Sequence, residues 1–138
     1  MECGVSTTIR ARPERIWALL TNASEFPKWN STVLSIEGTI GLDHRIKLRA
    51  RVAPTRTFKL KVSEFEQPRR MVWREGVAPI FQGIRTFVLS PRDNEFTGFS
   101  MVEVLKGLML PMIAGSLPDF GPSFEQFAED LKHEAERN

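Results

Sequence analysis

Arg85 and Glu103 are the side chains whose types and positions are best suited to chemistry in this sequence. They lie in two runs, 81–90 and 96–106, which predict a β-hairpin around Asp93-Asn94. If the loop is 93–95, the register sets three pairs opposite each other on one face: Arg85 and Glu103, Phe87 and Met101, Leu89 and Phe99. We expect this face to point inward, because the opposite face mixes polar and apolar residues.

A guanidinium and a carboxylate on an otherwise apolar wall are suited to be the polar anchor of a ligand site. Arg85 would hold a carboxylate, phosphate or enolate oxygen. Glu103 would orient Arg85, or accept a proton if burial raised its pKa. Two alternatives stay open: a structural ion pair near a cavity mouth, and a different register that leaves both residues in solvent.

Large apolar side chains fall on the faces that would surround such a site. Trp73 shares its strand face with Met71, so its ring would line a cavity or pack in the core. Glu75 has the same parity but lies near the strand end, so we expect it at the rim of the site. Trp29 follows Phe26 by about one helical turn, which suits a plug at the end of a cavity or a ligand contact. The predicted ligand contacts are Trp29, Trp73, Arg85, Phe87, Phe99, Met101, Glu103, Met109, Met112, Phe120 and Phe124.

The C-terminal part supplies four of these candidates. Met109 and Met112 lie in GLMLPMIAG, residues 107–115, where flexible methionines suit a mobile lid or fill gaps in a core. A helix is predicted over about 119–136, begun by Asp119 or by a capping box of Ser123 and Gln126. Its apolar stripe would seal it onto a sheet, with ligand contact mainly at the first two members: Phe120, Phe124, Phe127 and Leu131.

Periodicity predicts the elements that position these residues. A first strand is expected over 4–11, a helix begins at Pro13, and Ser24 is expected to cap a short helix over 24–29. The stretch 31–106 alternates with period two, which is typical of strands with one buried face. The expected strands are 33–38, 46–52, 58–63, 71–76, 81–90 and 96–106, with turns at Pro54-Thr55 and Gln67-Pro68.

Composition limits the class of protein. The 138 residues suggest one domain, 1–138, and no signal-peptide pattern precedes the first strand, so we expect a cytoplasmic protein. Its one cysteine, Cys3, excludes an internal disulfide framework and an all-cysteine metal site. The net charge of +2 is too mild and too dispersed for a nucleic-acid binder. No integral membrane segment is expected.

Basic residues alternate with apolar ones along two of the expected strands: Lys47, Arg49, Arg51, Lys59 and Lys61. This pattern is most typical of a solvated outer face. The alternative is a docking patch for an acidic partner or a membrane surface.

The order of elements indicates an α+β architecture, and at this point the sequence resembles the START-like, or SRPBCC, superfamily. More narrowly, it is similar to bacterial polyketide cyclase/dehydrase-and-lipid-transport-like proteins. Four segments and the long last helix carry the resemblance: IRARPERIWALLTNASEFPKWNSTV (9–33), RRMVWREG (69–76), GIRTFVLSP (83–91) and FTGFSMVEVLKG (96–107). It implies a helix-grip fold, in which a curved antiparallel sheet of six to seven strands wraps on a long C-terminal helix, with two short helices after the first strand.

The resemblance also implies a hydrophobic cavity between sheet and helix. We therefore expect binding of a small hydrophobic molecule, such as a lipid, isoprenoid or aromatic polyketide, without catalysis. The alternatives are a cyclase, aromatase or dehydratase using Arg85 and Glu103, and a co-chaperone-like interaction protein. No cofactor or metal is expected: the Rieske-type ligand pattern is missing, tyrosine is absent, and His44 and His133 are poorly placed for catalysis. The oligomeric state is left open.

Overall fold

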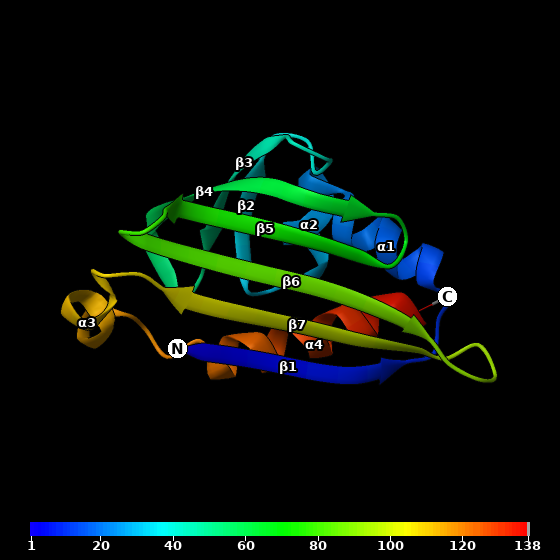
Figure 1. The fold of residues 1–138 in the computed structure, drawn as a ribbon. Coiled ribbons are helices and arrows are strands. Elements are labelled where there is room, and N and C mark those ends of the chain that lie inside the picture. Colours follow the sequence, from blue (N-terminus) through cyan, green and yellow to red (C-terminus); the bar gives the residue numbers. More distant parts are fainter. Residues whose placement is uncertain (138) are drawn as a thin grey trace.

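A long C-terminal helix, α4 (Gly121–Glu136), lies along the concave side of a curved seven-stranded sheet in the computed structural model (Figure 1). The structure describes residues 1–137. All neighbouring strands are antiparallel, in the order β1-β7-β6-β5-β4-β3-β2. The strands are β1 (Glu2–Ile9), β2 (Val33–Glu37), β3 (Arg45–Ala50), β4 (Ala53–Glu66), β5 (Arg70–Val77), β6 (Phe81–Pro91) and β7 (Thr97–Lys106).

Short helices occupy the two connections that leave the sheet. The first connection holds α1 (Pro13–Thr21), a 3-10 turn (Ala23–Glu25) and α2 (Phe26–Trp29). The second, between β7 and α4, holds α3 (Leu110–Ile113) and a 3-10 turn (Ala114–Ser116). This arrangement confirms the expected helix-grip fold with two short helices after the first strand. No helix in residues 1–137 is both long enough and apolar enough to cross a bilayer.

The β6–β7 hairpin confirms the predicted register. Arg85 stands opposite Glu103, and the apolar pairs Phe87 with Met101 and Leu89 with Phe99 follow on the same face. These apolar residues are all at most 2% exposed, so this face points inward as expected. The hairpin therefore delivers one buried charged pair to the concave side of the sheet.

Three local predictions are wrong. Ser24 does not cap a helix, because the chain enters α2 through a 3-10 turn without a side-chain cap. Ser123 lies inside α4, which begins at Gly121, and the backbone N–H of Gly121 donates to the carboxylate of Asp119 instead. Pro54-Thr55 is not a turn but part of β4.

The reason for the misplaced turn lies in the pairing of β4. Ala50 of β3 pairs with Ala53, so the connection is only the two residues 51–52. The β4–β5 ladder begins at Lys61 opposite Arg74, which leaves the first half of β4 paired with β3 alone. A proline, which lacks an N–H donor, is tolerated on such an edge.

Aromatic rings fill the space under α4. Phe127, 3% exposed, has its ring centroid 5.9–6.4 Å from the rings of four residues of three other elements: Phe26, Trp29, Phe87 and Phe99. Burial of such large apolar surfaces is the main stabilising contribution to a fold of this size. The sheet is thus closed against α4 at its middle by a packed aromatic core, and open space remains only toward the N-terminal end of the helix.

Candidate functional site

A cleft lies between the N-terminal half of α4 and the concave face of the sheet. Apolar side chains from β3, β4, β6, β7 and α4 dominate its wall, and four charged residues interrupt them. The lining residues that matter for the site are Leu48, Phe58, Leu60, Phe81, Met101, Leu117, Phe120 and Phe124 among the apolar ones, and Arg56, Glu75, Arg85 and Glu103 among the charged ones. The cleft is narrow, with a volume of about 50 Å³.

The four charged residues, hereafter the charge cluster (Arg56, Glu75, Arg85, Glu103), come from four neighbouring strands. Nε of Arg85 donates to Oε1 of Glu103 at 2.8 Å, and their side chains are only 17% and 12% exposed. The Arg85 guanidinium lies over the ring of Phe124, 5.0 Å from its centroid. Its terminal N–H groups donate to no acceptor within residues 1–137, although Arg85 lines the cleft. A positioned guanidinium therefore offers free donors to this space.

Glu75 can join the charge cluster because the residue opposite it is a glycine. It stands opposite Gly83 on β6, and a carboxylate oxygen of Glu75 and one of Glu103 each lie 3.0 Å from the point where a Cβ of Gly83 would be. The two oxygens are thus within about 6 Å of each other, where like charges disfavour double ionisation. A guanidinium nitrogen of Arg56, whose side chain is 44% exposed, lies 3.6 Å from a carboxylate oxygen of Glu75.

Burial raises the pKa of the Glu75 carboxyl above its usual value, Arg56 opposes this rise, and the nearby Glu103 carboxylate adds to it. The folded chain therefore keeps this proton at a higher pH than the unfolded chain does. Stability consequently falls as the pH rises from about 4.5 through the raised pKa, because the folded state binds more protons in that window.

The substitution Glu75→Gln tests this assignment. We expect the variant Glu75→Gln to become more stable relative to the wild type as the pH rises from 4 to 7. The reason is that the wild type must lose the proton of Glu75 in this range, whereas glutamine has no such proton to lose. Urea unfolding at each pH measures the difference, with Glu129→Gln, which removes an exposed carboxylate of α4, as control. Parallel pH profiles for wild type and Glu75→Gln would contradict the assignment.

Five of the eleven predicted contacts meet at the cleft. These are Arg85, Met101, Glu103, Phe120 and Phe124, which come from β6, β7 and the start of α4. The sequence periods of the hairpin and of the last helix were enough to bring them to one place. Whether they touch a ligand remains a prediction.

The other six predicted contacts lie elsewhere. Trp73, Phe87 and Phe99 are at most 1% exposed and belong to the core rather than the cleft wall, and the indole N–H of Trp73 meets no acceptor within residues 1–137. Trp29 is half-buried against Phe26, at 4.8 Å between ring centroids, and does not line the cleft. This position fits the first of the two interpretations of Trp29, a structural plug, rather than a ligand contact in the cleft.

Met109 and Met112 also differ from the prediction. They are 38% and 76% exposed on the segment around α3 and do not line the cleft. The reason is that Gly107 turns the chain outward after β7, so that α3 projects beyond the sheet (Figure 1). Neither methionine covers the site as a lid in this structure.

Sequence reasoning missed Arg56 and placed Glu75 at the rim of the site. Arg56 has the same strand parity as Phe58 and Leu60, which point inward, but the expected strand began only at residue 58. Glu75 shares the parity of Met71 and Trp73, and its side chain is 12% exposed because the glycine opposite gives it room to fold inward. The turn signature of Pro54-Thr55 ended the expected strand before Arg56, and the pattern of 71–76 alone does not show the glycine opposite Glu75.

Aromatic side chains fill most of the interior, so the cavity expected between sheet and helix is a narrow cleft. A second space nevertheless adjoins the cleft: a groove of about 350 Å³ between β1, the end of β7 and the segment 114–120. Glu103, Leu105, Leu117 and Phe120 line both spaces. Leu117 and Phe120 thus form the partition between them, on a connection rather than on a strand or in the middle of a helix.

Chemically, the site can bind an apolar body and one anionic or strongly accepting group. The carboxyls can also hold or move a proton, while the guanidiniums stay protonated and supply positive charge. No group of three or more His, Cys, Asp or Glu side chains that could hold a metal ion occurs in residues 1–137.

The comparisons with known proteins agree with this architecture. The family model described as polyketide cyclase/dehydrase and lipid transport matches residues 3–136. A hypothetical protein from Helicobacter pylori is similar in structure, with a TM-score of 0.79, 14% identity, and coverage of 98% of this chain and 88% of that one. A START superfamily protein from Mycobacterium smegmatis has a TM-score of 0.71 at 15% identity, with 98% and 97% covered.

A third similar structure is the di-domain ARO/CYC protein BexL from the BE-7585A biosynthetic pathway. Its TM-score is 0.68 at 16% identity, and the match covers 96% of this chain and 45% of the two-domain chain. No curated protein matches the sequence. At these identities, the similar structures show only that the fold is shared.

Proposed function

Because the chain belongs to the polyketide cyclase/dehydrase and lipid transport family, we propose that it binds a small molecule with an apolar body and an anionic group in the cleft beneath α4. The observation that carries this proposal is Arg85. Its guanidinium donates to Glu103 at 2.8 Å and lies over the Phe124 ring, while its remaining N–H groups meet no acceptor among the described residues 1–137, in a cleft whose wall is largely apolar. A few placed polar groups in an apolar pocket are typical of small-molecule sites.

The size of the ligand follows from the two adjoining spaces. The cleft alone, at about 50 Å³, is far below the roughly 300–1,000 Å³ of ordinary ligand pockets. If the side chains of Leu117 and Phe120 move aside, the cleft joins the groove of about 350 Å³ and reaches the lower end of that range. We therefore expect a ligand with an apolar part of about ten carbon atoms, entering past Leu117 and Phe120.

A matched pair of ligands and a matched pair of variants test this proposal. Decanoate and 1-decanol share the apolar chain, and only decanoate carries a charge for Arg85. Calorimetric titration should show tighter binding of decanoate to the wild type. Arg85→Gln should weaken decanoate binding by tenfold to a hundredfold, because charge-assisted hydrogen bonds contribute about 1.5–3 kcal/mol. Decanol binding should change little.

Arg70→Gln serves as the control, since Arg70 pairs with Glu64 and does not line the cleft. It should leave both affinities at the wild-type values. Equal affinities for decanoate and decanol in the wild type, or an equal loss in Arg70→Gln and Arg85→Gln, would contradict the role of Arg85. If the wild type binds neither decanoate nor decanol, the proposed function as a whole is wrong.

An enzyme that transfers protons, of the cyclase, aromatase or dehydratase type, is the second candidate. The observation that favours it is the pair of carboxyls, Glu75 and Glu103, in which burial raises the pKa of Glu75 beside Arg85. Such a group can accept a proton from carbon while a guanidinium stabilises the enolate. Deuterium exchange into a β-keto ester, followed by NMR, should then exceed the buffer rate with the wild type and fall to it in Glu75→Gln and Glu103→Gln. A wild-type rate equal to that of buffer would exclude this candidate for such substrates.

A further inference from the structure

Five large apolar side chains gather at one end of the molecule, where two connections meet. They belong to the β5–β6 turn and to the segment after β7, and their exposed fractions run from 38% for Met109 to 76% for Leu108 and Met112. We call this set the apolar tip: Val77, Ile80, Leu108, Met109 and Met112. A contiguous patch of this kind on a protein surface usually marks an interaction site.

The tip is held in this exposed position by its backbone. The N–H groups of Leu108 and Met109 donate to the carbonyls of Pro79 and Ile80, each at 2.9 Å. Gly107, at φ +130°, makes this approach possible, since a Cβ there would collide with the Ile80 carbonyl. The two connections therefore form one unit, and their apolar side chains cannot turn inward without breaking it.

The tip is also nearly free of charge. Residues 76–84 and 104–118 contain one charged residue, Lys106, and no acid. In Figure 1 the part of the tip around α3 projects beyond the end of the sheet as a convex unit. A protruding, uncharged and aliphatic unit can insert among lipid acyl chains, which are fluid and require no surface of complementary shape.

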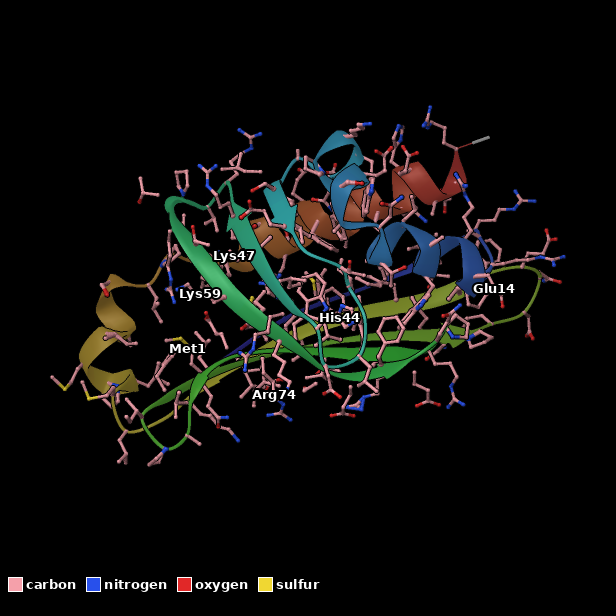
Figure 2. The ribbon with its side chains drawn as sticks, turned by 90° about the horizontal axis from the view of Figure 1, so that it is seen from above. Met1, Glu14, His44, Lys47, Lys59 and Arg74 are labelled. Carbon is pink, nitrogen blue, oxygen red and sulfur yellow. The ribbon has the colours of Figure 1, made fainter. Side chains whose placement is uncertain are left out.

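A basic strip on β3 and β4 supplies the second observation. Lys47 stands directly opposite Lys59, and Arg45 opposite Lys61. Like charges in such cross-strand positions destabilise a sheet. Of these four residues, only Lys61 reaches a carboxylate within residues 1–137, that of Asp43 at 3.9 Å. Figure 2 shows Lys47 and Lys59 on the half of the molecule that carries α3, whereas Glu14 lies at the other end.

We propose that the chain docks on the surface of an anionic lipid bilayer, with the apolar tip inserted among the acyl chains and the basic strip (Arg45, Lys47, Lys59, Lys61) over the head groups. An anionic surface offsets the repulsion between the facing cations, and a juxtaposed apolar unit adds insertion. Phe81, which lines the cleft, follows Ile80 of the tip directly in the chain. The use of docking to load this cleft rests on the proposed function, but docking itself does not.

Vesicle sedimentation tests the proposal. The wild type should bind vesicles of 70% phosphatidylcholine and 30% phosphatidylserine, and bind pure phosphatidylcholine vesicles at least tenfold more weakly. The double variant Leu108→Asp/Met112→Asp should lose at least tenfold in affinity for the mixed vesicles. Lys47→Glu/Lys59→Glu should lose the preference for phosphatidylserine.

Matched controls exclude general effects of added charge. Phe96→Asp places an acid at another exposed apolar side chain, 36% exposed in the β6–β7 connection, and Lys28→Glu reverses a lysine of α2 that is 72% exposed. Both should bind the mixed vesicles like the wild type. The proposal is overturned if the wild type stays in the supernatant. It is also overturned if the controls lose as much affinity for the mixed vesicles as the tip and strip variants do. A tip-dependent dimer in sedimentation velocity without vesicle binding would overturn it as well.

Decanoate titration in vesicle-free buffer separates this proposal from the proposed function. Tip and strip variants should bind decanoate like the wild type, because none of the substituted residues lines the cleft. If vesicle binding is absent while decanoate still binds, docking is wrong and the cleft site stands. If the chain binds vesicles but not decanoate, docking stands and the cleft site is wrong.

Discussion

Replacing Phe127 by alanine is expected to lower the free energy of unfolding by about 3–5 kcal/mol, the usual loss for a buried phenylalanine. Phe127 is 3% exposed, and its ring centroid lies 6.3 Å from those of both Phe87 and Phe99 and 5.9 Å from that of Phe26. Because these rings come from the sheet, α2 and α4, no single element can move to fill the resulting cavity. Chemical denaturation followed by circular dichroism measures the loss.

Phe96→Ala is the matched control for this prediction. Phe96 is 36% exposed in the β6–β7 connection, so the same change in composition should cost less than about 1 kcal/mol. A loss of under about 1.5 kcal/mol at Phe127 would mean that the core can rearrange around α4, and the closed aromatic centre described above would be wrong.

The second large effect is expected at Asn30, a fully buried polar residue at the end of α2. Its Nδ2 donates to the Phe127 carbonyl at 3.3 Å, and its Oδ1 accepts from the backbone N–H and the hydroxyl of Thr32 at 3.1 and 2.7 Å. Asn30→Ala leaves the two donors of Thr32, its N–H and its hydroxyl, without their buried acceptor and removes the bond to the Phe127 carbonyl, so we expect a loss of about 2–3 kcal/mol.

Ser31→Ala provides the comparison, since its hydroxyl also joins this loop to α4, at Asp130 Oδ2, 2.6 Å away, but in solvent. Water can replace that bond, and the loss should stay below about 1 kcal/mol. Equal losses in the two variants, measured by urea unfolding, would show that burial of the Asn30 amide contributes nothing special to the joint between α2 and α4.

The hairpin shows how far the sequence predicts this site. A short loop at 93–95 and a period of two were sufficient to pair Arg85 with Glu103 and to turn both inward. Register in a hairpin follows from loop length, and a slip by one residue would have exposed four buried apolar side chains. Local rules thus determine the Arg85–Glu103 half of the charge cluster.

Arg56 and Glu75 could not be found in the same way. Pro54 has the signature of a turn, and only the late start of the β4–β5 ladder makes it acceptable in a strand. Glu75 lies in the cleft because a glycine stands opposite it on another strand. Such effects depend on tertiary pairing, which the pattern of one segment does not contain.

The volume of the interior was beyond sequence reasoning for a related reason. A stripe of phenylalanines predicts that α4 packs on the sheet, but not how deeply its rings enter. Here Phe127 meets rings of α2, β6 and β7, and the space that remains lies beside the N-terminal half of α4, where Phe124 and Phe127 line the cleft. Side-chain packing therefore decides between a large cavity and a narrow cleft.

Mapping of amide chemical shifts during a titration with decanoate tests the central claim most directly. Binding in the cleft should shift the resonances of Arg85, Glu103, Leu117, Phe120 and Phe124 in a saturable way, and leave the outward-facing residues of β3 and β4 unchanged. Saturable shifts confined to the outer face or to the apolar tip, or the absence of saturable shifts, would contradict a ligand site between the sheet and α4.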